Sequence, residues 1–370
     1  MILNRLSIVN YKNIHEAELL FSRKLNCFFG DNGMGKTNLL DVLYYLSFCK
    51  SQTNLPDSQN ILHGEEFFVI QGIYDFDGKD EEIYCGLKRK QKKQFKRNKK
   101  EYDKLSDHIG TIPLVMVSPA DSALILGGSE ERRKFLDLVI AQYDKEYMGA
   151  LISYNRALAQ RNALLKEELY GDDTIYELWE EVMDNAGRVI FQGRCRFLEE
   201  FIPVFREYYK YVSGDAEEVS LEYSSHLSEG TLRPMLEATR ERDKLIGFST
   251  KGVHKDDLEM LLDTYPIKKI GSQGQNKTYL IALKLAQFEF LKRIGHTTPI
   301  LLLDDIFDKL DAHRVEQIVS LVASDQFGQI FITDTNRKYL DEILAACNQD
   351  YLIFRVQNGE VSELEKGEMP

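Results

Sequence analysis

The chain has 370 residues, of which 43% are hydrophobic and 29% are charged, and its formal net charge is −12 at pH 7. A chain of this length can bury a sizeable core, and the length alone predicts two or three domains. No window approaches the roughly 20 uninterrupted apolar residues of a membrane span, and the first residues lack the cationic head and apolar core of a secretory signal. We therefore expect no membrane partner and a cytoplasmic location.

The five cysteines are scattered along the chain. None belongs to a Cys-x-x-Cys pair or to a cluster with histidine: they are Cys27, Cys49, Cys85, Cys195 and Cys347. Such spacing predicts neither a zinc site nor a disulfide framework, so we interpret all five as reduced thiols.

The N-terminal part has the pattern of a sheet. Ile2, Leu6 and Ile8 predict one face of a first strand, which Asn4 interrupts, and a second apolar run at 25–29 leads into a glycine-rich turn. A helix is predicted after the turn, because four apolar residues share one helical face: Leu39, Val42, Leu43 and Leu46. Further strands are predicted at 67–74, 83–87 and 113–117.

Residues 129–243 are charged and poor in glycine, and their pattern predicts long helices. No a/d register extends over several heptads, so a compact helical lobe is favoured over a coiled coil. After Gly247 the sheet pattern returns, with buried strands predicted at 300–303 and 330–332. We therefore expect an α/β fold: residues 1–120 and 295–370 form a first, sheet-rich lobe, and residues 121–294 form an inserted, mainly helical second lobe.

A glycine-rich phosphate loop follows the run at 25–29. The pattern G-x-x-x-x-G-K-[ST] is met between an apolar strand and an amphipathic helix, by Gly30, Asp31, Asn32, Gly33, Met34, Gly35, Lys36 and Thr37, with Asn38 next. Its backbone N–H groups and the helix N-terminus would bind phosphate oxygens. Lys36 would reach the β- and γ-phosphates of ATP, and Thr37 would ligate Mg²⁺. The alternative is a glycine turn that only caps a helix.

Two carboxylates end the predicted strand at 300–303. Asp304 would hold the metal beside the phosphate loop, and Asp305 would polarise or deprotonate the attacking water. With Lys36 they form the predicted catalytic set. An apolar strand before an acidic turn is common, so the assignment depends on the phosphate loop.

Ser272, Gly274 and Gln275 precede a helix in which Ile281, Leu285, Phe288 and Leu291 share one face. A serine hydroxyl and glycine amides at a helix N-terminus can bind a γ-phosphate. The segment resembles the S-x-G-Q signature of the ABC-type ATPases. In that family the signature acts on the nucleotide of a second subunit, which implies a homodimer with ATP between the subunits. A simple helix cap would also explain Ser272.

Positive charge is concentrated at residues 88–104, which hold ten Lys or Arg and two acidic residues in an otherwise acidic chain. Such a run predicts a local anion-binding surface. We expect phosphate contacts to double-stranded DNA, with Arg132 and Arg133 as possible additions, from Lys92, Lys93, Lys96, Arg97, Lys99 and Lys100. The aromatic residues in the run are only Phe95 and Tyr102, so duplex is favoured over stacked single strands. A solvated hairpin is the alternative.

The resemblance extends over nearly the whole chain. Besides the motifs above, four blocks are similar to the RecF family in order and spacing: 3–14, 117–137, 153–165 and 251–258. The resemblance implies a slow, DNA-stimulated ATPase that works as a switch. It implies a head-to-tail dimer at gaps and single-strand/double-strand junctions, RecR and RecO as partners, help in loading RecA, and roles in replication, recombination and the SOS response.

Several family positions differ here. Lys12 and Lys255 stand where the family usually has Arg, Asp41 where it usually has Glu, and Val253 where Pro is common. Lys lacks the bidentate fork of Arg, so a phosphate or carboxylate contact there would be weaker. Asp305 replaces the Glu of many ABC proteins.

The same resemblance suggests roles for five further residues. Asp311 corresponds to the loop that crosses the dimer interface, and Thr333 or Asp334 to the γ-phosphate sensor. Ser118 and Asp121 correspond to the Q-loop.

Other ATPase classes fit less well. A transporter motor would need SGGQ and a switch histidine, and would not explain the basic run. An ATPase-nuclease of the OLD type needs a nuclease domain, for which the residues after Asp305 leave no room. A small-molecule kinase has no use for the signature.

Overall fold

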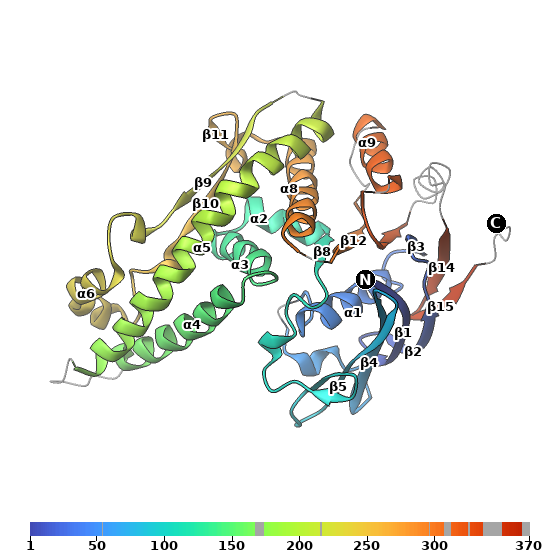
Figure 1. Ribbon diagram of the computed structural model, residues 1–370, viewed down its shortest axis with the longest axis horizontal. Helices are drawn as coiled ribbons and strands as arrows, with labels where there is room; N and C mark the ends of the chain where they lie inside the picture. Colours follow the sequence, from blue (N-terminus) through green and yellow to red (C-terminus); the bar gives the residue numbers. More distant parts are fainter. Residues whose placement is uncertain are drawn as a thin grey trace. The chain divides into compact units, whose positions relative to one another are not determined.

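The computed structural model describes residues 1–53, 55–166, 174–214, 217–295, 297–306, 312–324, 326–335 and 350–364. The chain forms two compact units (Figure 1). The first unit comprises Met1–Asp121 and Lys277–Pro370, and the second comprises Ser122–Asn276.

A mostly parallel sheet of order β15–β14–β3–β13–β12–β8 carries the phosphate loop. Its strands are β3 (Leu25–Phe29), β8 (Leu114–Val117), β12 (Ile300–Asp304), β13 (Ile330–Asp334), β14 (Tyr351–Gln357) and β15 (Glu360–Glu363). The strands β8, β12 and β13 are buried along their whole length, which explains their uninterrupted apolar sequences. The sheet combines strands from both ends of the chain, as predicted.

The second sheet of this unit is antiparallel, with the order β2–β1–β4–β5–β6–β7. Its strands are β1 (Ile2–Tyr11), β2 (Ile14–Leu20), β4 (Phe67–Phe76), β5 (Lys79–Lys88), β6 (Gln94–Arg97) and β7 (Lys100–Glu101). The pairing of β1 with β4 shifts its register between Leu3 and Arg5. This bulge at Asn4 reverses the alternation of inward and outward side chains along β1, so Leu3 is buried with Leu6 and Ile8. The prediction that Ile2 shares their face is therefore wrong.

In the described part of the first unit, the α-helices that lie wholly or mainly in it are α1 (Lys36–Phe48), α8 (Gln273–Ile294) and α9 (Ala312–Ala323). The second boundary lies at 276/277, whereas the sequence placed it at 294/295. The reason is that α8 packs on the first unit: the ring centroids of Phe288 and Phe327 are 4.7 Å apart, and Lys292 donates to the carbonyl of Gln326.

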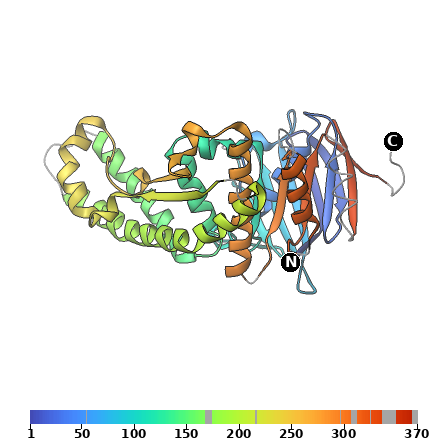
Figure 2. The same ribbon diagram turned by 90° about the horizontal axis from the view of Figure 1, so that it is seen from above.

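The second unit is mainly helical, as expected. Its helices are α2 (Ser122–Leu126), α3 (Ser129–Ile140), α4 (Lys145–Lys166), α5 (Thr174–Ser213), α6 (Leu232–Ile246) and α7 (Ile267–Ile270). Figure 1 shows α4 and α5 running alongside each other, and Figure 2 shows the same helices from above. The unit also contains a sheet of order β11–β10–β9, formed by β9 (Val219–Ser224), β10 (Asp257–Leu262) and β11 (Tyr265–Pro266). The helical pattern assigned to 129–243 missed β9.

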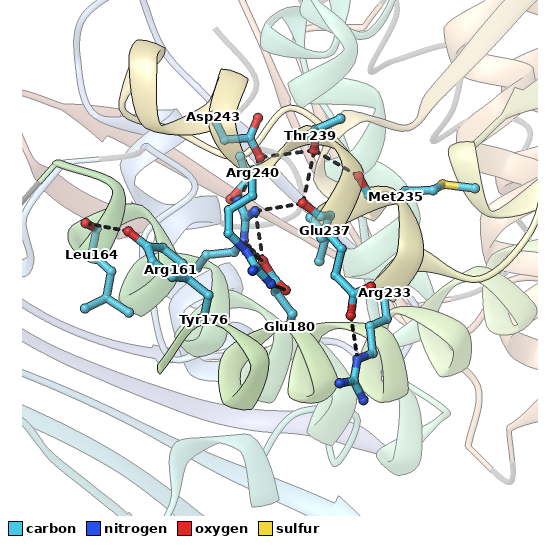
Figure 3. A network of polar contacts seen from close by, with 12 residues as sticks. Arg161, Leu164, Tyr176, Glu180, Arg233, Met235, Glu237, Thr239, Arg240 and Asp243 are labelled. Carbon is cyan, nitrogen blue, oxygen red and sulfur yellow. Dashed lines mark hydrogen bonds and ion pairs between the residues drawn. The ribbon is translucent and has the colours of Figure 1, made fainter. Parts of the chain in front are cut away.

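A buried ionic network joins α4, α5 and α6 (Figure 3). The guanidinium of Arg161 is fully buried and contacts Glu180 at 3.0 Å and Asp243 at 2.8 Å. Arg240 reaches the other oxygen of Glu180 at 2.6 Å. Charges without water are stable only when paired in this way, so the network fixes how the three helices pack.

Three of the four family-like blocks, 117–137, 153–165 and 251–258, contribute residues to this unit. Arg194 of α5 contacts Asp137 at 2.9 Å and Asp256 at 2.7 Å. His254 bonds to Tyr154 Oη at 2.7 Å, and burial lowers the pKa of His254 to about 4, so it stays neutral. These residues therefore organise the helical unit. Among the residues described, no helix is long and apolar enough to cross a membrane.

Candidate nucleotide site and basic hairpin

The phosphate loop connects β3 to α1 with a backbone that requires glycine. Gly33 and Gly35 have φ values of 80° and 113°. A Cβ on Gly30 would lie 2.3 Å from the carbonyl oxygen of Val356, so a side chain there would collide with β14. The glycines thus let the loop wrap tightly at the N-terminus of α1.

The ammonium of Lys36 lies inside the loop. It donates to the carbonyl oxygens of Gly30 at 2.7 Å and Asp31 at 2.8 Å. Burial lowers the pKa of Lys36, although the nearby carboxylates of Asp305 and Asp304 act in the opposite direction. A bound phosphate would offer the lysine anionic partners in place of these carbonyls.

Thr37 and Asp304 meet at the carboxyl end of the parallel sheet. Thr37 Oγ1 donates to the carboxylate of Asp304, at 3.0 Å from one oxygen and 3.1 Å from the other. Burial raises the pKa of Asp304, and hydrogen bonds from Thr333 and Thr37 counteract it. Two adjacent hard-oxygen ligands in octahedral Mg²⁺ coordination lie about 2.9 Å apart, so this pair fits magnesium.

Thr333 lies on β13, which separates β3 from β12 in the sheet. Its hydroxyl is fully buried and donates to Asp304 at 2.6 Å. The backbone N–H of Asp305, whose φ is 49°, is 3.2 Å from both the carbonyl and the hydroxyl oxygen of Thr333. The predicted sensor threonine therefore holds the carboxylate of Asp304 and the backbone of Asp305. Asp334 is also buried, beside it.

Two turns from distant parts of the chain brace the phosphate loop, and the sequence pattern missed them. Asn13, in the β1–β2 turn, donates to the carbonyl of Met34 at 3.1 Å and accepts from Asn38 at 2.7 Å. The backbone N–H of Gly359, in the β14–β15 turn, also donates to Met34 at 2.9 Å. The dipeptide Asn358-Gly359, whose φ values are 51° and 83°, is the sequence signal that could have marked the second turn.

Lys12 and Asp41, both unusual for the family, form an ion pair at 2.6 Å. The carboxylate of Asp41 also accepts from Tyr11 Oη at 2.6 Å and from the backbone N–H of Gln52 at 2.7 Å. The sequence analysis considered these two positions separately, whereas in the structure their side chains are in direct contact.

The predicted Q-loop residues continue this polar chain. Gln52 donates to Ser118 Oγ at 2.8 Å, the Ser118 N–H donates to Asp121 at 2.7 Å, and Lys284 of α8 contacts Asp121 at 2.8 Å. Ser118 and Asp121 therefore link the region after α1 to the helix that follows the signature.

The signature lies at the N-terminus of α8. The Ser272 N–H donates to Gln275 Oε1 at 2.8 Å, and the Gln275 N–H is 3.2 Å from Ser272 Oγ, which is a reciprocal helix cap. Gln275 also donates to Glu217 at 2.8 Å. Ser272 is exposed and Gly274 is half-buried, so the cap leaves the serine accessible. Asp311, the predicted interface residue, lies outside the described residues.

The basic run forms a hairpin at the edge of the antiparallel sheet, where β5 pairs with β6 and β6 with β7. Lys92, Lys99 and Lys100 are exposed. Lys96 lies 5.4 Å from the ring centroid of Tyr84, and Arg97 pairs with Glu81.

Three basic residues differ from the expectation of free phosphate contacts. The ammonium of Lys93 is 2.7 Å from Asp57, and only 12% of its side chain is exposed. Arg132 pairs with Asp257 at 2.7 Å, and Arg133 donates to the carbonyl of Asp256 at 2.6 Å. All three cations therefore already have partners within the protein.

Comparisons with known proteins identify the family and the fold. Residues 1–156 match the AAA ATPase domain. A protein named DNA replication and repair protein RecF from Bacteroides thetaiotaomicron is 64% identical over 365 residues, which are 98% of this chain and 99% of that protein. The fold matches a structure of the recombination mediator protein RecF-ATP in the RecFOR pathway, with a TM-score of 0.87, 28% identity and coverage of 98% and 97%.

A more distant match concerns the fold alone. The SmcHead bound to the C-winged helix domain of ScpA superposes with a TM-score of 0.60 at 14% identity, covering 100% of this chain and 99% of the other. The α/β head fold with an inserted helical unit is thereby confirmed. The near-complete coverage at 64% identity, with the ATPase domain at residues 1–156, shows that this chain is an ATPase that belongs to the RecF family.

Proposed function

We propose that this chain binds ATP with Mg²⁺ at the phosphate loop and hydrolyses it slowly as the switch of a DNA-bound dimer. The observation that carries the proposal is the contact of Thr37 with Asp304 beside the buried ammonium of Lys36. In this arrangement Lys36 binds the β- and γ-phosphates, and the loop N–H groups bind phosphate oxygens. The predicted phosphate-binding set runs from Gly30 to Asn38.

Thr37 and Asp304 would hold the metal, which neutralises phosphate charge when bound. Asp305 accepts the proton of the attacking water. The water oxygen bonds to the γ-phosphorus as the bond to the bridging oxygen breaks, and ADP and phosphate leave. Thr333 holds the carboxylate of Asp304 through its hydroxyl, and its carbonyl oxygen accepts from the backbone N–H of Asp305.

Dimerisation completes the site. The accessible Ser272, with Gly274 and Gln275, would bind the γ-phosphate held by the partner, and Asp311 would cross the interface. ATP then stabilises a head-to-tail dimer, and hydrolysis releases it. The accessibility of Ser272 despite its helix cap supports this reading.

The DNA partner is double-stranded DNA, including gapped DNA and single-strand/double-strand junctions. The names of the related proteins, which refer to DNA replication and repair and to the RecFOR pathway, support this biological setting. We place the chain in recombinational repair with RecO and RecR, upstream of RecA loading, and in replication maintenance and the SOS response. Lys92, Lys96, Lys99 and Lys100 are the phosphate contacts that best fit the structure.

Replacing these four lysines by alanine should weaken duplex binding at every sequence. Each lost phosphate contact lowers the slope of log affinity against log salt by about 0.9, so the quadruple variant should lose a slope of about 3 to 4. Fluorescence anisotropy with a labelled duplex, titrated at several salt concentrations, measures this slope.

A matched control removes four exposed lysines outside the run: Lys79, Lys134, Lys145 and Lys210. Their replacement by alanine should leave the slope unchanged. If the hairpin variant binds DNA like the wild type, the hairpin is not the DNA surface.

A further inference from the structure

Lys93 lies within the basic run of the sequence, but its ammonium is held by contacts inside the protein. Its ammonium donates to the carbonyl of Cys49 at 2.6 Å and to Asp57 at 2.7 Å, and it is 3.1 Å from Tyr45 Oη. It also lies 5.0 Å from the ring centroid of Tyr45. Tyr45 in turn donates to Asp57 at 2.7 Å, so the three side chains form a closed polar cluster. A DNA phosphate could bind Lys93 only after this cluster had opened.

The cluster lies at the C-terminal end of α1. Cys49 is the residue that caps this helix, with a φ of 55°, and its N–H bonds to the carbonyl of Tyr45. The last carbonyls of a helix have no partner within the helix and carry partial negative charge. Lys93 supplies both a donor and a positive charge to this end.

A second set of contacts connects the basic hairpin to the last turn of α1. His108 is fully buried, and its Nε2 is 2.7 Å from the carbonyl oxygen of Leu46 in α1. The ring of Phe95, which belongs to β6, packs on His108 with centroids 4.7 Å apart, and Tyr102 Oη lies 3.0 Å from His108 Nδ1. The basic hairpin therefore contacts the end of α1 directly at the Cys49 carbonyl, and indirectly at the Leu46 carbonyl through His108.

The other end of α1 is the phosphate loop. The helix begins at Lys36 and spans 13 residues, a length of about 20 Å. Its sequence contains neither glycine nor proline, and almost all of its side chains are buried. Such a helix moves as a rigid body, so a displacement at Cys49 is transmitted to Lys36 and Thr37.

We propose that Lys93 is a positioning residue that couples DNA binding on the hairpin to ATP hydrolysis through α1, and is not itself a DNA contact. This inference rests on the proposed function, because it assumes that exposed lysines such as Lys92 bind DNA and that DNA stimulates hydrolysis. DNA bound to the exposed face of the hairpin changes the position of the hairpin. The contacts of Lys93 with Cys49 and Asp57 transmit that change to α1, which begins at Lys36.

Two substitutions weaken the ion pair between Lys93 and Asp57, one at each partner. Lys93→Met keeps the length of the side chain and removes its charge, whereas Asp57→Asn weakens the same ion pair and removes no positive charge from the run. Lys92→Met is the matched control, because Lys92 is adjacent and exposed. Lys93→Arg retains a cation that can pair with Asp57 and should restore the coupling in part.

The experiment measures ATP hydrolysis without DNA and at saturating duplex, and the salt dependence of duplex binding by anisotropy, after circular dichroism has confirmed folding. For Lys93→Met and Asp57→Asn, the ratio of the stimulated to the unstimulated rate should fall toward one, while the salt slope stays at the wild-type value. For Lys92→Met, the slope should drop by about 0.9 while saturating DNA still stimulates hydrolysis.

The other outcomes separate the two proposals. If Lys93→Met lowers the salt slope as Lys92→Met does, and Asp57→Asn keeps full stimulation, Lys93 is a DNA contact and the coupling role is overturned. The coupling role of Lys93 is also overturned if DNA fully stimulates hydrolysis in both Lys93→Met and Asp57→Asn. It is overturned as well if the wild-type chain binds DNA but DNA does not stimulate its hydrolysis. A wild-type chain that does not bind DNA contradicts the proposed function instead.

Discussion

We expect the Asp305→Asn variant to hydrolyse ATP about 100 to 10,000 times more slowly than the wild type while it still binds ATP. The amide has nearly the shape of the carboxylate but cannot take the proton of the attacking water. Asp305 directly follows β12, and its N–H is held by Thr333, so the backbone should stay in place. Single-turnover hydrolysis together with equilibrium binding of labelled ATP measures both properties.

The control for this prediction is Lys36→Ala. It removes the ammonium from the phosphate loop, so it should abolish ATP binding, and hydrolysis with it. If Asp305→Asn turned over at the wild-type rate, the acceptor of the proton would have to be another group. Loss of ATP binding in Asp305→Asn would instead assign the residue to binding.

We expect the Arg161→Met variant to lose about 3–5 kcal/mol of unfolding free energy in the helical unit. Glu180 and Asp243 are fully buried, and the substitution leaves Asp243 and one oxygen of Glu180 without the guanidinium that compensates their charge (Figure 3). Urea unfolding followed by circular dichroism should show an earlier transition for this variant.

An exposed ion pair supplies the control. Arg188 lies on α5 and contacts Asp184 at 3.7 Å, with 56% of the Arg188 side chain exposed. Arg188→Met should cost less than about 1 kcal/mol because solvent screens such pairs. Equal losses in the two variants would mean that Arg161 contributes no more than a surface pair.

Local patterns correctly predicted the elements that carry the phosphate loop and its neighbouring carboxylates. The phosphate loop, β3, α1 and β12 are contiguous stretches whose function depends on local backbone geometry and strand burial, and they lie where the sequence placed them. The concentration of positive charge at 88–104 was also visible in the sequence, and its role as an anion-binding surface stays a prediction.

Features that depend on distant contacts were not predictable in the same way. The burial of Lys93 requires Asp57 and the end of α1, and the bracing of Met34 requires Asn13 and Gly359 from opposite ends of the chain. The strand β9 was missed because its partner β10 lies more than thirty residues later. The inward position of Leu3 followed from a bulge that only the pairing with β4 reveals.

The most direct test compares the wild type with Ser272→Arg, each without nucleotide, with ADP and with ATP. Analytical ultracentrifugation gives the oligomeric state, and anisotropy gives the duplex affinity. The account predicts that the wild type dimerises and holds DNA tightly only with ATP, whereas Ser272→Arg binds ATP but does neither. If both proteins bind DNA equally without dimerising, the signature does not act between subunits and the ATP-gated dimer is contradicted.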